Sequence, residues 1–221
     1  MASYWRIKRW HHALAIQSHL PVFNNLYHDI NGYQLSRQAR ATHDGLEFIY
    51  GEIEFLSFIA LLSLTKPDKN TLFYDLGSGT GKAVLACTMV YSVHKAVGIE
   101  YFPALHHCAQ KQAQQLAQQP AYAQQSKAIE FIRNDFFNEP LIHATLIFIN
   151  ATTLFGNTWE RLVAHLESQA KQATIITTSK ALHSPYFKIS HQTQVSMSWG
   201  IVWAYIHIPV ATLTKQLENI E

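Results

Sequence analysis

A glycine-rich stretch reads Asp75-Leu76-Gly77-Ser78-Gly79-Thr80-Gly81-Lys82, and it joins an apolar strand pattern at residues 72–76 to a helical pattern at 82–93. Glycine at such a junction lets the backbone adopt conformations that other residues avoid, and lets a ligand approach closely. The free N–H groups at the start of the following helix favour a negative group. The stretch therefore predicts a strand–loop–helix unit with a ligand site at the carboxyl end of the strand.

Strand and helix patterns alternate on both sides of this stretch. An apolar helix pattern precedes it at residues 52–64, and the patterns that follow are strands at 96–99, 129–132, 146–149 and 174–178 and helices at 103–119 and 158–169. Such alternation predicts an α/β fold with a doubly wound, mostly parallel, Rossmann-like sheet. The last two strand patterns, 194–198 and 201–208, are separated only by Trp199-Gly200, so the seven-stranded sheet should end in an antiparallel hairpin.

The chain is expected to divide into an N-terminal helical cap at residues 1–48 and one α/β domain at residues 49–221. Apolar residues in the first part recur at spacings of three and four, which predicts amphipathic helices broken around Pro21 and Gly32. A length of 221 residues is too short to favour two complete enzyme domains.

Charge and cysteine content restrict the partners and the compartment. The first 43 residues hold five basic side chains against one acidic one, which leaves a charge of +4 on this N-terminal arm. The total charge of +2 is too small to predict a nucleic-acid partner, so the arm is the one part of the chain that could contact nucleic acid. Two distant cysteines favour a reducing, cytoplasmic compartment and no disulfide framework. No apolar run is long enough for a secretory signal or a membrane span, and the His pairs suit a shared metal poorly, so neither a membrane nor a metal partner is expected.

The spacing of the glycines indicates which nucleotide-like ligand the loop would take. The dinucleotide fingerprint is G-x-G-x-x-G, whereas this chain has G-x-G-x-G followed by Lys82, with Asp75 two residues before the first glycine. A pocket for S-adenosylmethionine must hold an ammonium group and a sulfonium rather than a pyrophosphate. Asp75 is placed to offset that positive charge, so the loop favours S-adenosylmethionine over NAD.

Polar side chains end the next three strands as well. Glu100 ends the second strand, where a carboxylate can accept hydrogen bonds from both ribose hydroxyls. Asp135 follows the third strand, where it could accept a hydrogen bond from the adenine amino group while Phe136 packs on the ring. Asn150 ends the fourth strand and is expected near the transferable methyl group. A single such residue would more often be a helix cap, but a series of acids points to one cofactor site.

Together these motifs resemble the non-SET histone lysine methyltransferases, the disruptor-of-telomeric-silencing family, over roughly residues 48 to 208. In chain order they are Tyr50-Gly51-Glu52, Asp75 to Gly81, Gly98-Ile99-Glu100, Asn134-Asp135-Phe136, Phe148-Ile149-Asn150 with Phe155-Gly156, Ser179-Lys180, Val195-Ser196-Met197-Ser198-Trp199 and Tyr205-Ile206-His207. The resemblance implies a class I S-adenosylmethionine-dependent methyltransferase that modifies protein lysine and yields S-adenosylhomocysteine. It also implies a loop at Tyr50, Gly51 and Glu52 that covers the cofactor.

The chain departs from this family on the acceptor side. Ala151 and Thr152 stand where the family has a second Asn and an aromatic residue, and Lys82 stands where it has Gln. The candidate walls of a lysine channel are Phe155, Trp199, Trp203 and Tyr205, with Asn150 orienting the nitrogen. Two alternatives to a protein lysine methyltransferase remain open: a small-molecule methyltransferase of the same fold, and a non-catalytic module that only binds a partner.

Overall fold

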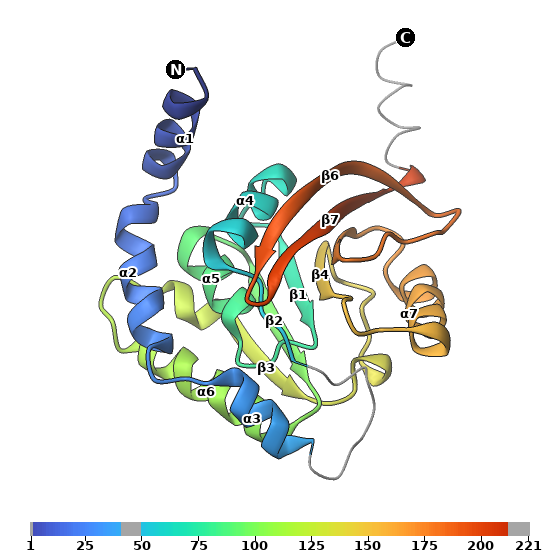
Figure 1. Cartoon of the computed structure of the whole chain (residues 1–221), viewed down its shortest axis with the longest axis horizontal. Helices are drawn as coiled ribbons and strands as arrows, with labels where there is room; N and C mark the ends of the chain where they lie inside the picture. The colour runs from blue at the N-terminus through green and yellow to red at the C-terminus, as the bar shows by residue number, and fades with distance from the viewer. Residues whose placement is uncertain (1, 41–49, 212–221) are drawn as a thin grey trace.

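A computed structural model describes residues 2–40 and 50–211 of the chain. The strands are β1 (Leu72–Leu76), β2 (Lys95–Glu100), β3 (Ile129–Arg133), β4 (Leu146–Asn150), β5 (Thr174–Thr178), β6 (Phe187–Met197) and β7 (Gly200–Pro209). The α-helices are α1 (Ala2–Ala13), α2 (Ile16–Tyr27), α3 (Gly32–Ala39), α4 (Phe55–Thr65), α5 (Lys82–Val90), α6 (Pro103–Ala117) and α7 (Gly156–Gln169), and the short 3-10 helices are η2 (Gln125–Ala128) and η3 (Phe136–Asn138). Figure 1 labels most of these elements.

The strands form one sheet in the order β3-β2-β1-β4-β5-β7-β6. Strands β1 to β5 pair parallel with one another, and β7 pairs antiparallel with both β5 and β6. The chain winds outward from β1 to β3 and then returns to the other side of β1 with β4. This reversal opens a crevice at the carboxyl ends of β1 and β4, which is where ligands bind in such sheets. The predicted doubly wound sheet with an antiparallel end is confirmed.

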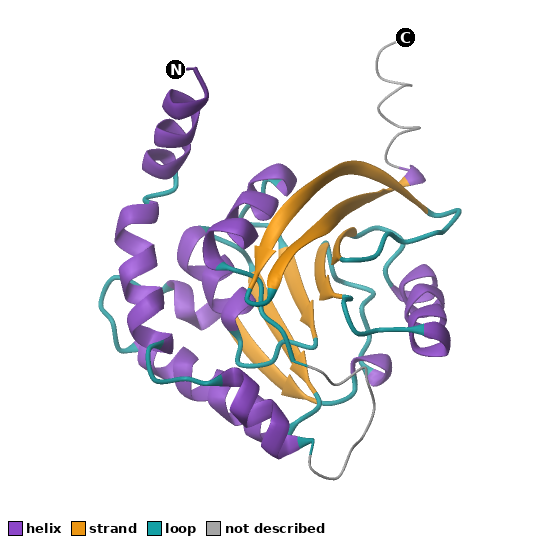
Figure 2. Cartoon of the chain, in the orientation of Figure 1, coloured by secondary structure: helices purple, strands orange, loops and turns teal. Residues whose placement is uncertain are grey.

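Helices cover both faces of the sheet (Figure 2), as a parallel sheet requires. Alternate residues of β4 enter two separate cores: Phe148 packs in the core that includes residues of α4 and α5, and Ile147 and Ile149 pack in the core that includes residues of α7. A strand that is buried along its length, as β4 is, forms a continuous apolar run in the sequence. Short apolar runs predicted the five parallel strands to within one residue at each end.

The terminal hairpin is longer than its sequence pattern indicates. Strand β6 begins at Phe187 rather than at residue 194. Residues 188–192 are all exposed and Ile189 is the single apolar residue among them, so this part of the edge strand lacks the apolar pattern on which the prediction depended. Residues 187–193 nevertheless belong to the strand, because they pair in register with β7, and β7 is apolar.

The N-terminal helices follow one side of the molecule, where α2 contacts α5 and α6, and α3 contacts α6 (Figure 1). The predicted helix break at Pro21 is wrong, because Pro21 lies inside α2 and the break falls at Ala15, whose φ is 46°. A proline removes one helical hydrogen bond, but burial of Phe23 and Leu26 on the next turns holds α2 together. The predicted break near Gly32 is confirmed. The predicted domain boundary at residues 48–49 lies outside the described residues.

Candidate active site

A cavity of about 350 Å³ lies at the carboxyl ends of the central strands. Its walls include twelve of the thirteen residues predicted to bind the cofactor: Tyr50, Gly51, Glu52, Asp75, Gly77, Ser78, Gly79, Lys82, Glu100, Asp135, Phe136 and Asn150. Lining residues that the sequence argument missed include Ser36, Tyr101, Phe102, Phe137, Leu154 and Arg161. The missed residues come from neighbouring elements whose contribution depends on tertiary packing and not on a local motif.

The glycine loop turns sharply between β1 and α5. Gly77, Gly79 and Gly81 have φ values of 80°, 54° and 84°, in the region that side chains disfavour. The N–H groups of Gly77 and Ser78 both donate to the Ile99 carbonyl oxygen, at 2.9 and 3.0 Å, which fastens the loop to β2. Gly81 does not line the cavity. A Cβ there would lie 2.6 Å from the Phe131 ring, so Gly81 permits close packing beneath the loop.

Glu100 is buried at the end of β2 and is held by the backbone N–H groups of Gly79, Tyr101 and Phe102. Its Oε2 accepts a hydrogen bond from Gly79 N at 2.8 Å, and its Oε1 accepts one from Phe102 N at 2.8 Å. Burial raises the pKa of Glu100, while these hydrogen bonds act to lower it. A carboxylate has about four acceptor sites, so the backbone donors of Gly79, Tyr101 and Phe102 leave room for a further hydrogen bond. The group is therefore oriented by the fold and can still accept a hydrogen bond from a ligand hydroxyl.

Asp75 lies beside this carboxyl group and is only 4% exposed. Burial, together with the nearby Glu100 carboxylate, raises the pKa of Asp75 to about 8. A carboxylate is costly to bury without a compensating charge. Two acidic groups facing one cavity therefore favour a ligand that brings a positive charge to Asp75.

The far end of the cavity is aromatic. The rings of Phe136 and Phe137 lie 4.6 Å apart, and the Arg161 guanidinium lies 4.3 Å from the centre of the Phe137 ring. Asp135 caps η3, with a side-chain oxygen accepting a hydrogen bond from Phe137 N at 3.0 Å. The cap fixes the Asp135 carboxylate beside flat apolar surfaces, an arrangement that suits a purine ring with an exocyclic amino group.

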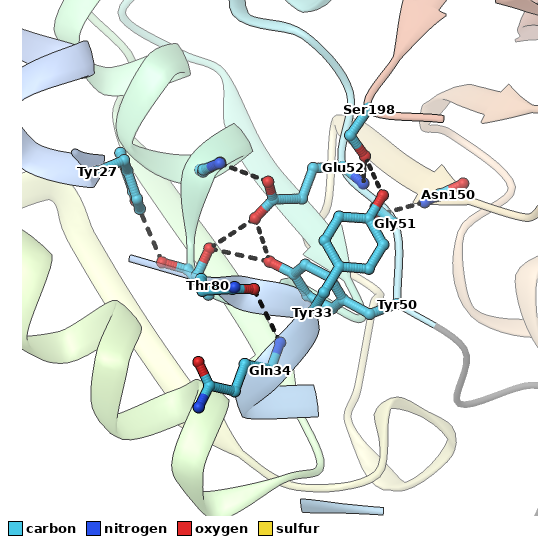
Figure 3. Close-up of polar contacts among 11 residues, drawn as sticks. Tyr27, Tyr33, Gln34, Tyr50, Gly51, Glu52, Thr80, Asn150 and Ser198 are labelled. Carbon is cyan, nitrogen blue, oxygen red and sulfur yellow. Dashed lines mark hydrogen bonds and ion pairs between the residues drawn. The ribbon is translucent and has the colours of Figure 1, made fainter. Parts of the chain in front are cut away.

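The segment 50–54 closes another side of the cavity (Figure 3). The Tyr50 hydroxyl donates to Glu52 Oε1 and lies 3.0 Å from Thr80 Oγ1, and Lys82 Nζ donates to Glu52 Oε2. Glu52 and Lys82, both predicted to bind the cofactor, thus form an ion pair that ties this segment to the start of α5. Residues 52–54 were expected to be helical, which is wrong. They run beside the end of β6, where Glu54 N donates to Ser196 O at 3.0 Å.

Asn150 joins β4 to the same segment. Its Nδ2 donates to Gly51 O at 2.9 Å, and its Oδ1 accepts hydrogen bonds from the Thr152 and Thr178 hydroxyls at 2.9 and 2.8 Å. Both lone pairs of Oδ1 are therefore occupied, and one N–H remains to face a ligand. The predicted role of Asn150 in orienting an acceptor nitrogen stays a prediction, and this geometry limits it to donation.

The predicted aromatic walls of the acceptor channel do not line the cavity with Asn150. Phe155 is 56% exposed, Trp203 and Trp199 are also exposed, and Tyr205 is half-buried on β7. The Trp199 ring packs on the backbone of Gly51, where it occupies the space that a Cβ would need. Trp199 thus lies against Gly51 and Phe155 lies at the loop after β4, and the predicted catalytic role of Phe155, Trp199 and Tyr205 stays a prediction.

Lys180 organises the loop that follows β4. Its Nζ donates to the carbonyl oxygens of Ala151, Thr152 and Leu154 at 2.9, 3.3 and 2.6 Å, and it lies 3.8 Å from the centre of the Phe155 ring. Burial lowers the pKa of Lys180. The Lys180 ammonium group thus supplies hydrogen bonds to the carbonyl oxygens of a loop that forms neither helix nor strand.

Residues 2–40 and 50–211 contain no cluster of three or more His, Cys, Asp or Glu side chains suited to a metal ion. None of the helices in these ranges has the length and apolar character needed to cross a membrane.

The fold is shared with solved methyltransferases. An RNA methyltransferase from Salinibacter ruber, in complex with S-adenosyl-L-homocysteine, has a TM-score of 0.56 at 22% identity, covering 69% of this chain and 90% of that one. Magnesium protoporphyrin IX methyltransferase from Synechocystis PCC 6803, with bound SAM, has a TM-score of 0.54 at 14% identity, covering 86% and 90%. At these identities the likeness establishes the Rossmann-like methyltransferase fold.

Sequence comparison identifies the family. A curated protein of Eremothecium gossypii, named "Histone-lysine N-methyltransferase, H3 lysine-79 specific", is 28% identical over 179 residues, covering 74% of this chain. The match spans 31% of that relative's length. The family model described as "Histone methylation protein DOT1" matches residues 35–202, from α3 to β7. The chain therefore belongs to the DOT1 family of histone methylation proteins.

Proposed function

We propose that this chain is an S-adenosylmethionine-dependent methyltransferase that modifies lysine in a protein. The observation that carries the proposal is the meeting of Asp75, Glu100 and Asp135 in one cavity, each delivered by a different strand end. Asp75 suits a positively charged group of a ligand, Glu100 suits a sugar with free hydroxyls, and Asp135 suits a purine ring. The same three groups make up S-adenosylmethionine.

The residues of the cavity suit the cofactor from end to end. Asp75 would compensate the positive charge of its amino-acid part, and Glu100 would accept a hydrogen bond from a ribose hydroxyl. Asp135 and the ring of Phe136 would hold the adenine. When bound, the cofactor supplies a methyl group already activated by the sulfonium, so the protein chiefly has to align the donor with the acceptor.

An acceptor nitrogen would reach the cavity past aromatic side chains that lie outside it. An amine must lose its proton before it can accept a methyl group, and an apolar approach lowers the pKa of an amine by removing water. Trp199 and Phe155 flank the segment and the loop that Asn150 joins. Lysine in a protein is favoured over other amines because the family is one of histone methylation proteins. The alternative is a small-molecule acceptor, since Ala151 and Thr152 depart from the family pattern.

Labelled methyl transfer tests the proposal. The full chain would be incubated with tritium-labelled S-adenosylmethionine and, separately, with histones, with total protein and with the metabolite fraction of its source cells. Label recovered as methyl-lysine after acid hydrolysis supports the proposal. Label confined to the metabolite fraction contradicts the lysine assignment and favours the alternative. Absence of cofactor binding by calorimetry would exclude both, and an Asp75→Ala variant provides the inactive control.

We propose a cellular compartment for the chain from the state of its two cysteines. Cys87 and Cys108 are both free and buried, and burial raises the pKa of each thiol. Such thiols are unreactive and need no oxidising environment. A reducing compartment such as the cytoplasm suits this chain, and fractionation of source cells with an antibody to it would test the location.

A further inference from the structure

The helix α3 supplies one wall of the cavity, although it precedes the segment 50–54 and belongs to the predicted N-terminal cap. Ser36 lies on α3, is 1% exposed and lines the cavity. Its Oγ is buried without a hydrogen-bond partner among the described residues. Buried hydroxyl groups in folded proteins are nearly always hydrogen-bonded, so an unpartnered one beside a cavity calls for a partner in that cavity.

We propose that α3 is part of the cofactor site and that the Ser36 hydroxyl forms a hydrogen bond with the nucleoside part of the bound cofactor. This inference rests on the proposed function. The nucleoside part is chosen because α3 packs against α6, and the turn that leads into α6 lines the cavity beside Glu100. Tyr101, Phe102 and Leu105 come from this turn and the first turn of the helix.

The position of α3 is set by the protein itself. The Tyr50 ring lies between Gly32, the first residue of α3, and Gly79 of the glycine loop. A Cβ at Gly32 would lie 2.5 Å from Tyr50 Cε1, and one at Gly79 would lie 2.7 Å from Tyr50 Cε2. Opposite edges of the ring are therefore in contact with backbone that only glycine leaves open. The ring connects α3 rigidly to the loop that forms the floor of the site.

A second connection runs from α3 to the terminal hairpin. The Tyr33 and Ser198 hydroxyls lie 2.5 Å apart, and Ser198 Oγ also accepts a hydrogen bond from Glu52 N at 3.1 Å (Figure 3). Ser198 lies in the turn between β6 and β7. Segments far apart in the sequence thus hold α3 in place, so Ser36 is already positioned when a ligand arrives. A group positioned in advance loses little conformational entropy on binding.

The test compares Ser36→Ala with Ser18→Ala, a matched substitution at an exposed position on α2. Affinities for S-adenosylmethionine, S-adenosylhomocysteine and 5′-methylthioadenosine would be measured by calorimetry. Ser36→Ala should weaken all three by about threefold to tenfold, the usual range for one lost hydrogen bond. The loss should persist for methylthioadenosine because that ligand keeps the nucleoside and lacks the amino-acid part. Ser18→Ala should bind as the wild type does.

Thermal unfolding without ligand separates this role from a structural one. Removing a hydroxyl that makes no bond within the protein should leave the midpoint unchanged or raise it, while ligand affinity falls. Ser36→Met, which would fill the cavity, should abolish detectable binding with the fold retained. Wild-type affinity in Ser36→Ala would overturn this inference and leave the proposed function intact. Failure of the wild type to bind any of the three ligands would overturn the proposed function as well.

Discussion

Asn150 Nδ2 donates a hydrogen bond to the carbonyl oxygen of Gly51 across 2.9 Å, and this bond joins the end of β4 to the segment that covers the cavity. The same side chain accepts hydrogen bonds from Thr152 and Thr178. The segment before α4, the loop after β4 and the end of β5 therefore meet at one amide group. This amide has a structural task whether or not it also contacts the methyl acceptor.

Replacing Asn150 by Ala should reduce both stability and methyl transfer. The change leaves the Gly51 carbonyl without its partner and deprives two hydroxyls of their acceptor, which should lower the free energy of unfolding by about 1–3 kcal/mol. Urea denaturation would measure this loss. Thr152→Ala serves as the control, because it removes one of the three hydrogen bonds of Asn150, together with the contact to Ser179 Oγ, and should cost less. A variant with wild-type stability would show that Asn150 does not hold the segment.

The pKa of Asp75 predicts how cofactor binding depends on pH. Because the pKa of Asp75 is about 8 without ligand, the group is largely protonated at pH 6. A cationic ligand favours the carboxylate, so binding should release a proton, and affinity should rise with pH until it levels off above 8. Calorimetry between pH 6 and 9 would measure this. Asp75→Asn should bind weakly and lose the rise, and an unchanged profile in that variant would assign the titration to another group.

The same group predicts an opposite trend for stability in the absence of ligand. The folded-state pKa lies above the ordinary value of 3.8, so folding favours the protonated form of Asp75. Its contribution to stability is fully present below pH 3.8 and is lost as the pH rises through about 8. Asp75→Asn should therefore be more stable than the wild type at pH 9. Thermal unfolding without ligand at pH 6 and pH 9 would reveal the difference, and a less stable variant at pH 9 would contradict it.

Replacing Lys180 should affect methyl transfer to the acceptor more than it affects binding of the cofactor. Lys180→Met removes the cation that three carbonyl oxygens share, and hydrogen bonds to charged groups contribute about 1.5–3 kcal/mol. Stability should fall by that order, and methyl transfer should fall by more than cofactor affinity does. Urea denaturation, calorimetry and labelled transfer would separate the three quantities. Lys180→Arg, which keeps the charge, should recover part of the loss.

Two glycines of the loop should differ in their response to Ala. Gly77 and Gly79 both have positive φ, so Ala at either position meets backbone strain of about 1–2 kcal/mol. A Cβ at Gly77 meets nothing within 4 Å, whereas one at Gly79 meets the Tyr50 ring. Gly79→Ala should therefore lower the unfolding midpoint further than Gly77→Ala. Equal midpoints would show that the ring can move aside without cost.

The amino-acid sequence alone determined the parallel sheet and most residues of the cavity wall that we propose binds the cofactor. Short apolar strands with Asp75 or Glu100 at or near their carboxyl ends can be located from the local sequence. A buried strand needs apolar residues, and strand ends of this kind face the ligand site in such folds. The spacing of the glycines is likewise a feature of one loop, so it can be read from neighbouring residues. These features could be predicted since each depends on residues that are neighbours in the chain.

Only the tertiary structure decided which other residues surround this part of the cavity. Nothing near Ser36 in the sequence indicates a pocket, and it reaches the cavity only because α3 packs on α6 and against Tyr50. Pro21 predicted a helix break that burial of the adjacent turns prevents. Asn150 and Lys180 were visible as strand-end residues, but their partners come from other elements. Long-range packing and hydrogen bonding, which have no sequence period, set those contacts.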